Sequence, residues 1–184
     1  MTAVVCLLRG VNVGGHHKIG MEALRDICLS LKLRNPQTYI QSGNVVFGYG
    51  EADVANLAAR VESAIEKRFG FRPIVMLRTA DDIRAVMKRN PFAARKDLEP
   101  AKLAVSFLLE TPAAEIARRL SALKVGPEEL HVVGRELFIY FPDGMGRSKL
   151  PAALERTIKI PATARNWNTV KRLLVMAEDL EASI

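Results

Sequence analysis

The chain has 184 residues, of which 49% are hydrophobic, and its 27 Lys and Arg residues exceed its 20 Asp and Glu residues, so its formal net charge is +7. This hydrophobic content is sufficient for a folded core and excludes an intrinsically disordered chain. No stretch approaches the roughly 18 apolar residues that a membrane-spanning helix needs. The apolar run at residues 4–8 ends at Arg9, too early for a secretory signal. We therefore expect a soluble, cytoplasmic protein.

The first half of the sequence has the pattern of a β-α-β-β-α-β unit with a trailing helix. Apolar and β-branched runs predict strands at residues 2–8, 38–41, 45–47 and 73–78, and helical spacing predicts helices at 21–31 and 53–69. Asn35-Pro36 is expected to interrupt the chain before the second strand. Thr79 is expected to cap the trailing helix, with Asp82 three residues later as its partner.

The second half repeats this order. We expect strands at residues 102–109, 130–133 and 137–141, an extended piece at 162–166, and helices that start at Thr111-Pro112, near Ser148 and after Trp167. The fold class is therefore α+β, with two tandem ferredoxin-like halves and mainly antiparallel sheets. We place the halves at residues 1–90 and 101–184.

The two cysteines, Cys6 and Cys28, lie within apolar patterns and are expected to be buried small hydrophobic residues. Two such residues do not form a disulfide framework, which is typical of a reducing compartment.

In this fold the first and second strands run in the same direction, so the loop after the first strand lies beside the turn after the second. Glycines there let backbone N–H groups approach a ligand, and the following helix start favours an anion. The candidate ligand-binding residues are Arg9, Asn12, Gly14, Gly15, Lys18, Gln41, Ser42 and Asn44. The alternative is that these are ordinary turn residues.

By the same reasoning, residues 142–149 lie beside residues 165–167 in the second half. Here the candidate ligand-binding residues are Arg147, Ser148, Lys149, Arg165 and Asn166. Cations beside a helix start suit a phosphate or a carboxylate. Trp167 is interpreted as a core anchor, and stacking on a ligand ring is the alternative.

No standard catalytic or cofactor motif is present. The sequence has neither G-x-G-x-x-G nor G-x-x-x-x-G-K-[ST], and its cysteines and histidines lack zinc-type spacing. No metal or cofactor is expected, and no catalytic residue is assigned. His17, beside the glycine loop, is the only general-base candidate.

Five motifs along the chain carry a family resemblance: residues 7–15, 41–45, 90–92, 142–150 and 163–167. Through them the whole chain resembles the bacterial family called domain of unknown function 1697. The pattern departs at His16, His17 and Gly20, where many members have Lys, Asn and Pro. The resemblance implies a small, cytoplasmic, two-part α/β protein, and it implies no activity.

The leading functional hypothesis is a protein that binds a small anionic ligand at its glycine-rich loops, either as an enzyme or as a binding protein. Two alternatives stay open: nucleic-acid binding, which the net positive charge favours, and a structural or protein-interaction module without catalysis.

Overall fold

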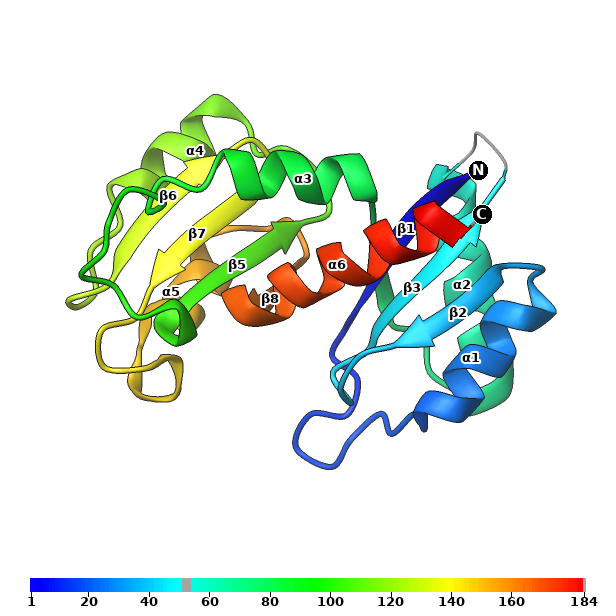
Figure 1. Ribbon diagram of the computed structural model, residues 1–184. Coiled ribbons are helices and arrows are strands. Elements are labelled where there is room, and N and C mark those ends of the chain that lie inside the picture. Colours follow the sequence, from blue (N-terminus) through cyan, green and yellow to red (C-terminus); the bar gives the residue numbers. More distant parts are fainter. Residues whose placement is uncertain (51–53, 184) are drawn as a thin grey trace. The chain divides into compact units, whose positions relative to one another are not determined.

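The computed structural model describes residues 1–50 and 54–183 (Figure 1). The first half contains β1 (Thr2–Arg9), α1 (Met21–Ser30), β2 (Arg34–Thr38), β3 (Asn44–Tyr49), α2 (Val54–Phe69), β4 (Ile74–Thr79) and α3 (Ala80–Lys88). The second half contains a 3₁₀ turn (Pro100–Lys102), β5 (Leu103–Leu108), α4 (Ala114–Ser121), β6 (Glu129–Val133), β7 (Glu136–Tyr140), a 3₁₀ turn (Met145–Arg147), α5 (Leu150–Thr157), β8 (Ala162–Asn166) and α6 (Trp167–Ser183). The predicted mixed α+β class is confirmed.

The chain divides into two compact units. The first consists of residues 1–84 and 172–184, and the second consists of residues 85–171. The sequence-based halves at residues 1–90 and 101–184 differ from these units in two respects: residues 85–90 belong with the second unit, and the end of α6 belongs with the first. The first unit is therefore built from both ends of the chain.

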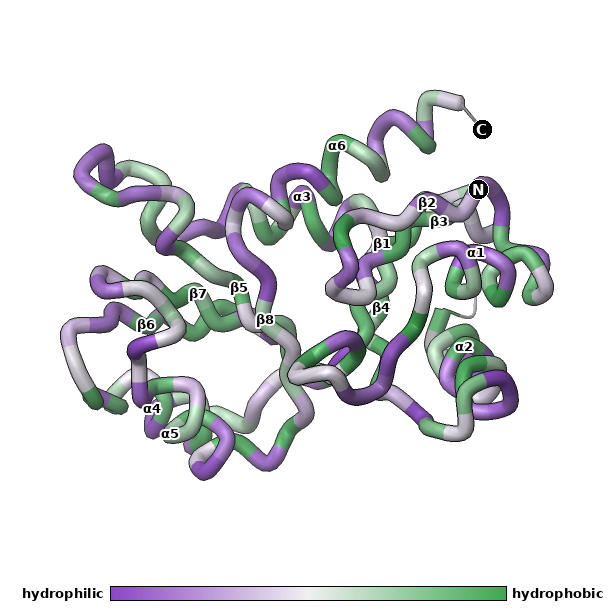
Figure 2. Tube along the Cα trace, turned by 90° about the horizontal axis from the view of Figure 1, so that it is seen from below, coloured by the Kyte–Doolittle hydropathy of each residue, from purple (hydrophilic) through white to green (hydrophobic). Residues whose placement is uncertain are grey.

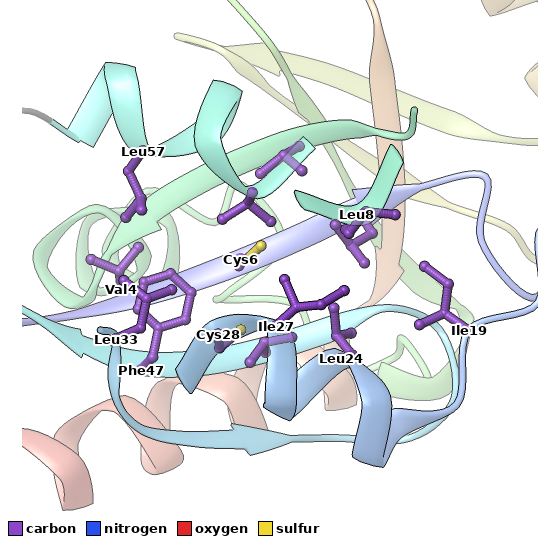
Figure 3. Close-up of a cluster of buried hydrophobic side chains, with 14 of the residues drawn as sticks. Val4, Cys6, Leu8, Ile19, Leu24, Ile27, Cys28, Leu33, Phe47 and Leu57 are labelled. Atoms are coloured by element: carbon purple, nitrogen blue, oxygen red, sulfur yellow. The ribbon is translucent and has the colours of Figure 1, made fainter. Parts of the chain in front are cut away.

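The first unit contains a four-stranded sheet in the order β2-β3-β1-β4, and all neighbouring strands are antiparallel. Side chains alternate between its faces. One face packs against α1 and α2, and Figure 3 shows this core, with Val4, Cys6 and Leu8 of β1 meeting Leu24 of α1 and Leu57 of α2. Figure 2 shows hydrophobic and hydrophilic residues alternating along α2, as a helix with one buried face requires.

Ion pairs fasten the end of α6 within the first unit. Arg84 of α3 donates to the Glu178 carboxylate at 3.0 Å and to the Glu181 carboxylate at 2.6 Å, and it also pairs with Asp81 at 2.7 Å. Hydrogen bonds to these three carboxylates raise the pKa of Arg84. The backbone N–H of Ala3 in β1 donates to the other Glu181 oxygen at 3.4 Å. These contacts tie both α3 and β1 to α6.

The second unit has a sheet with the corresponding order, β6-β7-β5-β8, and again every neighbouring pair is antiparallel. Its core lies between one face of this sheet and α4 and α5, with Leu108, Leu120 and Leu154 among the buried residues. The element order of the first half is thus repeated in the second.

Strand β2 begins earlier than predicted, at Arg34, and it includes the Asn35-Pro36 pair that was expected to interrupt the chain. Pro36 is tolerated because β2 is an edge strand. One side of an edge strand has no neighbouring strand, so a backbone donor missing on that side breaks no hydrogen bond of the sheet. The register shifts between Arg34 and Gln37, and Asn35 has a φ of 46°. The irregularity that the sequence signalled is a bulge inside the strand.

Two helix starts can be compared with their sequence signals. The capping box at α3 is confirmed: the N–H of Asp82 donates to Thr79 Oγ1 at 3.1 Å, and the N–H of Thr79 donates to the Asp82 carboxylate at 2.9 Å. The prediction that Pro112 occupies the first position of α4 is wrong, because α4 starts at Ala114.

Among residues 1–50 and 54–183, no helix is both long and apolar enough to cross a lipid bilayer.

Cys6 and Cys28 are free and buried, as predicted. Desolvation by burial raises the pKa of Cys28 to about 12, and a backbone hydrogen bond opposes this only in part. We predict that neither thiol of the native protein reacts with Ellman's reagent at pH 8, and that both react after denaturation. Rapid reaction in the native state would contradict this burial.

The same shift predicts the direction of a pH effect. Unfolded Cys28 ionises near its ordinary pKa of 9.0, whereas the folded protein holds the proton up to about pH 12. The unfolded state therefore loses its proton first, so this thiol lowers the free energy of unfolding as the pH rises above about 9. Replacing Cys28 by Ala should remove that part of the decline.

Candidate functional site

The loop after β1 and the turn between β2 and β3 lie together at one end of the first sheet (Figure 1). Leu7 in β1 is opposite Asn44 in β3, and the N–H of Leu8 donates to the carbonyl of Gly43 at 2.9 Å. We call residues 9–19 with residues 39–44 the loop corner. The predicted adjacency of these two segments is therefore present.

The side chain of Asn12 fastens the two segments of the loop corner. Its Nδ2 donates to the carbonyl of Gln41 at 2.8 Å and to the carbonyl of Ile19 at 3.0 Å, and its Oδ1 accepts from the N–H of Ile19 at 2.9 Å. Its φ of 55° lies in the left-handed region, which Asn tolerates better than most residues. One carboxamide thus closes the loop on itself and ties it to the turn.

Asn44 holds the turn from inside the protein. This residue is 0% exposed, its Nδ2 donates to the carbonyl of Tyr39 at 3.0 Å, and its own carbonyl accepts from the N–H of Tyr39 at 3.1 Å. The side-chain amides of Asn12 and Asn44, the two asparagines predicted to bind ligand at the loop corner, therefore bond to protein backbone. In this geometry, Asn12 and Asn44 stabilise the conformation of the loop corner.

The remaining predicted residues of the loop corner lie at its surface. All are exposed to solvent: Arg9, Gly14, Gly15, Lys18, Gln41 and Ser42. Arg9 follows Leu8, which points into the core beside α1 and α2, so strand alternation turns Arg9 toward the opposite face of the sheet. Lys18, Gln41 and Ser42 are exposed polar residues of the two segments that the Asn12 side chain joins.

His17 is fixed by two contacts that the sequence did not predict. Its Nδ1 donates to the carbonyl of Gly10 at 3.2 Å, and its ring stacks on Phe71, with centroids 4.4 Å apart and planes 19° apart. Phe71 lies just after α2, far from His17 in sequence, so no spacing rule would pair them. The sequence identified the histidine and missed the aromatic residue beneath it.

In the second unit, the loop at residues 142–149 presents Arg147 and Lys149 to solvent. Ser148 lies between them, and its hydroxyl accepts from the N–H of Leu150, the first residue of α5, at 3.0 Å. The N-cap position itself is Lys149, one residue later than the predicted cap at Ser148. The same hydroxyl donates to the carboxylate of Glu128. A carboxylate at this position opposes the binding of an anion to Ser148.

Arg165 and Trp167 lie inside the second unit. Arg165 is 7% exposed, and it donates to Thr163 Oγ1 at 2.7 Å and to the carbonyl of Ala164 at 2.9 Å. Trp167 is 8% exposed and its ring lies 6.3 Å from that of Phe138. The core interpretation of Trp167 is therefore confirmed, and neither side chain extends an exposed binding surface.

Asn166 acts at the start of α6. Its Oδ1 accepts from the N–H of Asn168 at 2.9 Å, and its Nδ2 donates to the carbonyl of Ala101 at 2.7 Å. The predicted second cluster thus separates into two exposed cations, Arg147 and Lys149, and a buried end of β8. In the described part of the chain, no group of three or more His, Cys, Asp and Glu side chains is placed to hold a metal ion.

The comparisons with known proteins identify the family. A family model described as "Protein of unknown function (DUF1697)" matches residues 1–138, so the chain belongs to this family, as its motifs predicted. The chain is also similar to the structure of the conserved bacterial protein SP0830 from Streptococcus pneumoniae, with 24% sequence identity and a TM-score of 0.75. That similarity covers 96% of this chain and 98% of the other, and at this identity it shows a shared fold alone. No curated protein matches the chain.

The loop corner requires glycine at position 43. Gly43 has a φ of 73°, and a Cβ there would clash with Val11 Cγ2 and would lie 2.8 Å from Leu8 Cβ. Gly10 is a matched control, because it has the same φ of 73° and a Cβ added to it would meet no atom within 4 Å. Gly10→Ala should therefore lower the free energy of unfolding by about 1–2 kcal/mol through backbone strain. Gly43→Ala should cost about 1–3 kcal/mol more through overpacking.

Denaturant unfolding of both variants and the parent measures these two costs. Equal destabilisation by the two substitutions would show that the turn does not pack on Leu8 and Val11 as described.

Proposed function

We propose that this DUF1697 protein binds a small anionic ligand, bearing a phosphate or a carboxylate group, at the loop corner. The observation that carries the proposal is the Asn12 clamp, which ties the backbone of the segment with Lys18 to the backbone of the segment with Gln41 and Ser42. A cation on a loop whose backbone is held in place, beside exposed glycine backbone, is suited to an anion, since little backbone freedom is lost on binding.

The exposed glycines support the same assignment. Gly14 and Gly15 have φ values of 59° and 80°, and both are exposed between Asn12 and Lys18. They are the central residues of a tight turn, which is closed by a hydrogen bond from the N–H of His16 to the carbonyl of Val13 at 3.1 Å. Without a Cβ, they leave room for a ligand to approach the backbone.

The loop at residues 142–149 is the weaker candidate. Arg147 and Lys149 are exposed there, but Ser148 is already bonded to Glu128, and Arg165 is buried in the sheet. We therefore assign the ligand to the loop corner of the first unit, with Lys18 as its main cation.

We also propose that each half has the ferredoxin-like topology. The strand orders β2-β3-β1-β4 and β6-β7-β5-β8, with antiparallel neighbours throughout, support this finer assignment. We further propose that these halves occupy residues 1–90 and 101–184. We also propose that the protein is located in the cytoplasm. The free, buried cysteines fit a reducing compartment.

Binding of nucleic acid on the sheets finds less support. Ferredoxin-like sheets that bind RNA stack bases on exposed aromatic side chains. The aromatic residues on the strands of the two sheets are buried: Phe47, Tyr49, Phe107, Phe138 and Tyr140. A base has no access to these rings.

A protein-interaction surface is the second candidate function, because two apolar side chains are exposed at the loop corner. Val13 is 66% exposed and Ile40 is 50% exposed, and Ile40 also has a φ of 48°, which is rare for a β-branched residue. If contact with a protein is the function of the loop corner, a Val13→Ser/Ile40→Ser double variant will lose that contact, and phosphate will have no effect on the parent.

A matched pair of lysine variants tests the anion proposal. Lys18 precedes α1 and Lys32 follows it, and both side chains are exposed. We predict that Lys18→Gln weakens the binding of inorganic phosphate about five-fold or more at low ionic strength, since the loss of one charge-assisted hydrogen bond costs at least about 1 kcal/mol. Lys32→Gln should bind as the parent does. Isothermal titration calorimetry measures both.

The affinity of the parent should also fall as salt is added, because the contact is exposed and ionic. Absence of phosphate and acetate binding to the parent at millimolar concentrations would refute the proposal, as would equal affinities of the two lysine variants.

A further inference from the structure

The ring of His17 forms a flat platform at the loop corner. It is stacked on Phe71, and Phe71 in turn packs on the hydrophobic core of the first unit. Phe69 lies 6.3 Å from Phe71, and the guanidinium carbon of Arg68 lies 5.8 Å from the Phe69 ring centroid. A series of ring contacts therefore supports His17 from below.

Two hydrogen bonds set the orientation of this platform. Because a carbonyl oxygen can only accept, the contact from His17 Nδ1 to the Gly10 carbonyl places a proton on Nδ1. The carbonyl of His17 accepts from the N–H of Asn12 at 3.1 Å. The Gly10 carbonyl thus holds the ring, and Asn12 holds the backbone of the same residue.

The His17 residue is exposed to solvent although Phe71 stacks on one face of its imidazole. The face away from Phe71 is therefore the one on which a ligand could stack. Proteins bind nucleobases by stacking them on exposed aromatic side chains, and such stacking tolerates any of the bases. Trp167, for which stacking on a ligand was the alternative interpretation, is buried and cannot take this role.

Lys18 follows His17 directly in the chain and is also exposed. Because the lysine side chain is long and flexible, its ammonium can reach an anionic group of a ligand whose planar ring stacks on His17. A nucleoside phosphate combines these two groups, because its sugar joins a planar base to a phosphate.

We propose that the ligand of the loop corner is a nucleoside phosphate, with its base stacked on His17 and its phosphate bound by Lys18. This inference rests on the proposed function and narrows it, because an anion alone would make no use of the ring. The base adds affinity through stacking, which is about 1–3 kcal/mol per base at aromatic platforms.

The experiment compares two ligands that differ only in the base. Adenosine 5′-monophosphate and ribose 5-phosphate share the sugar and the phosphate, and only the former can stack. Titration calorimetry of the parent should give an affinity for adenosine monophosphate at least about five-fold higher than for ribose 5-phosphate.

The variant His17→Asn removes the ring and retains a residue that tolerates the φ of 50° at this position. It should bind adenosine monophosphate only as well as ribose 5-phosphate, and its affinity for ribose 5-phosphate should equal that of the parent, which also shows that the site is intact. His131→Asn is the control, since His131 is an exposed histidine of the second unit that meets Phe92 edge-on. It should behave as the parent does.

Each other outcome has a distinct meaning. Equal affinities of the parent for the two ligands, or an equal loss for both in His17→Asn, would overturn the base-stacking inference and leave the anion site standing. No binding of either ligand, or of inorganic phosphate, would overturn both proposals.

Discussion

The carboxamide of Asn12 is the contact on which the loop corner depends. It joins the loop after β1 to the carbonyl of Gln41 in the neighbouring turn, and it closes the loop through two bonds to Ile19. Both segments are exposed and carry several residues with positive φ, so their own backbone preferences do not fix them relative to each other. A side chain that donates and accepts at once supplies that constraint. The Gly10 carbonyl and the Phe71 ring, which contact the His17 side chain, hold the same part of the loop.

The two halves differ in the connection between their first strand and first helix more than in their sheets. Equivalent registers place Arg78 opposite Val5 in the first sheet and Arg165 opposite Val105 in the second, and both arginines are buried. The sheets thus repeat each other in detail. The connection from β1 to α1 covers residues 10–20, however, and the connection from β5 to α4 is shorter. The proposed anion site lies on the longer of these two connections.

Local sequence signals predicted the parts of the fold that local physics determines. Apolar β-branched runs located the strands, and the Thr79–Asp82 pair located a helix start, because a capping box needs only neighbouring residues. Strand β2 was misplaced because Pro36 normally ends regular structure, and its tolerance depends on β2 lying at the sheet edge. Likewise, the sequence placed Asn12 in the candidate site. Whether its amide bonds to a ligand or to the protein backbone depends on the tertiary structure, which the sequence pattern does not give. The stacking of His17 on Phe71 had no sequence signal.

Hydrogen exchange in an Asn12→Gly variant tests the clamp most directly, because glycine accepts the φ of 55° and removes only the carboxamide. The account predicts faster amide exchange in residues 10–19 and in residues 39–43 together, with the sheet protected as in the parent. Faster exchange in residues 10–19 alone, with the turn unchanged, would show that the two segments are held by other means and would contradict the account.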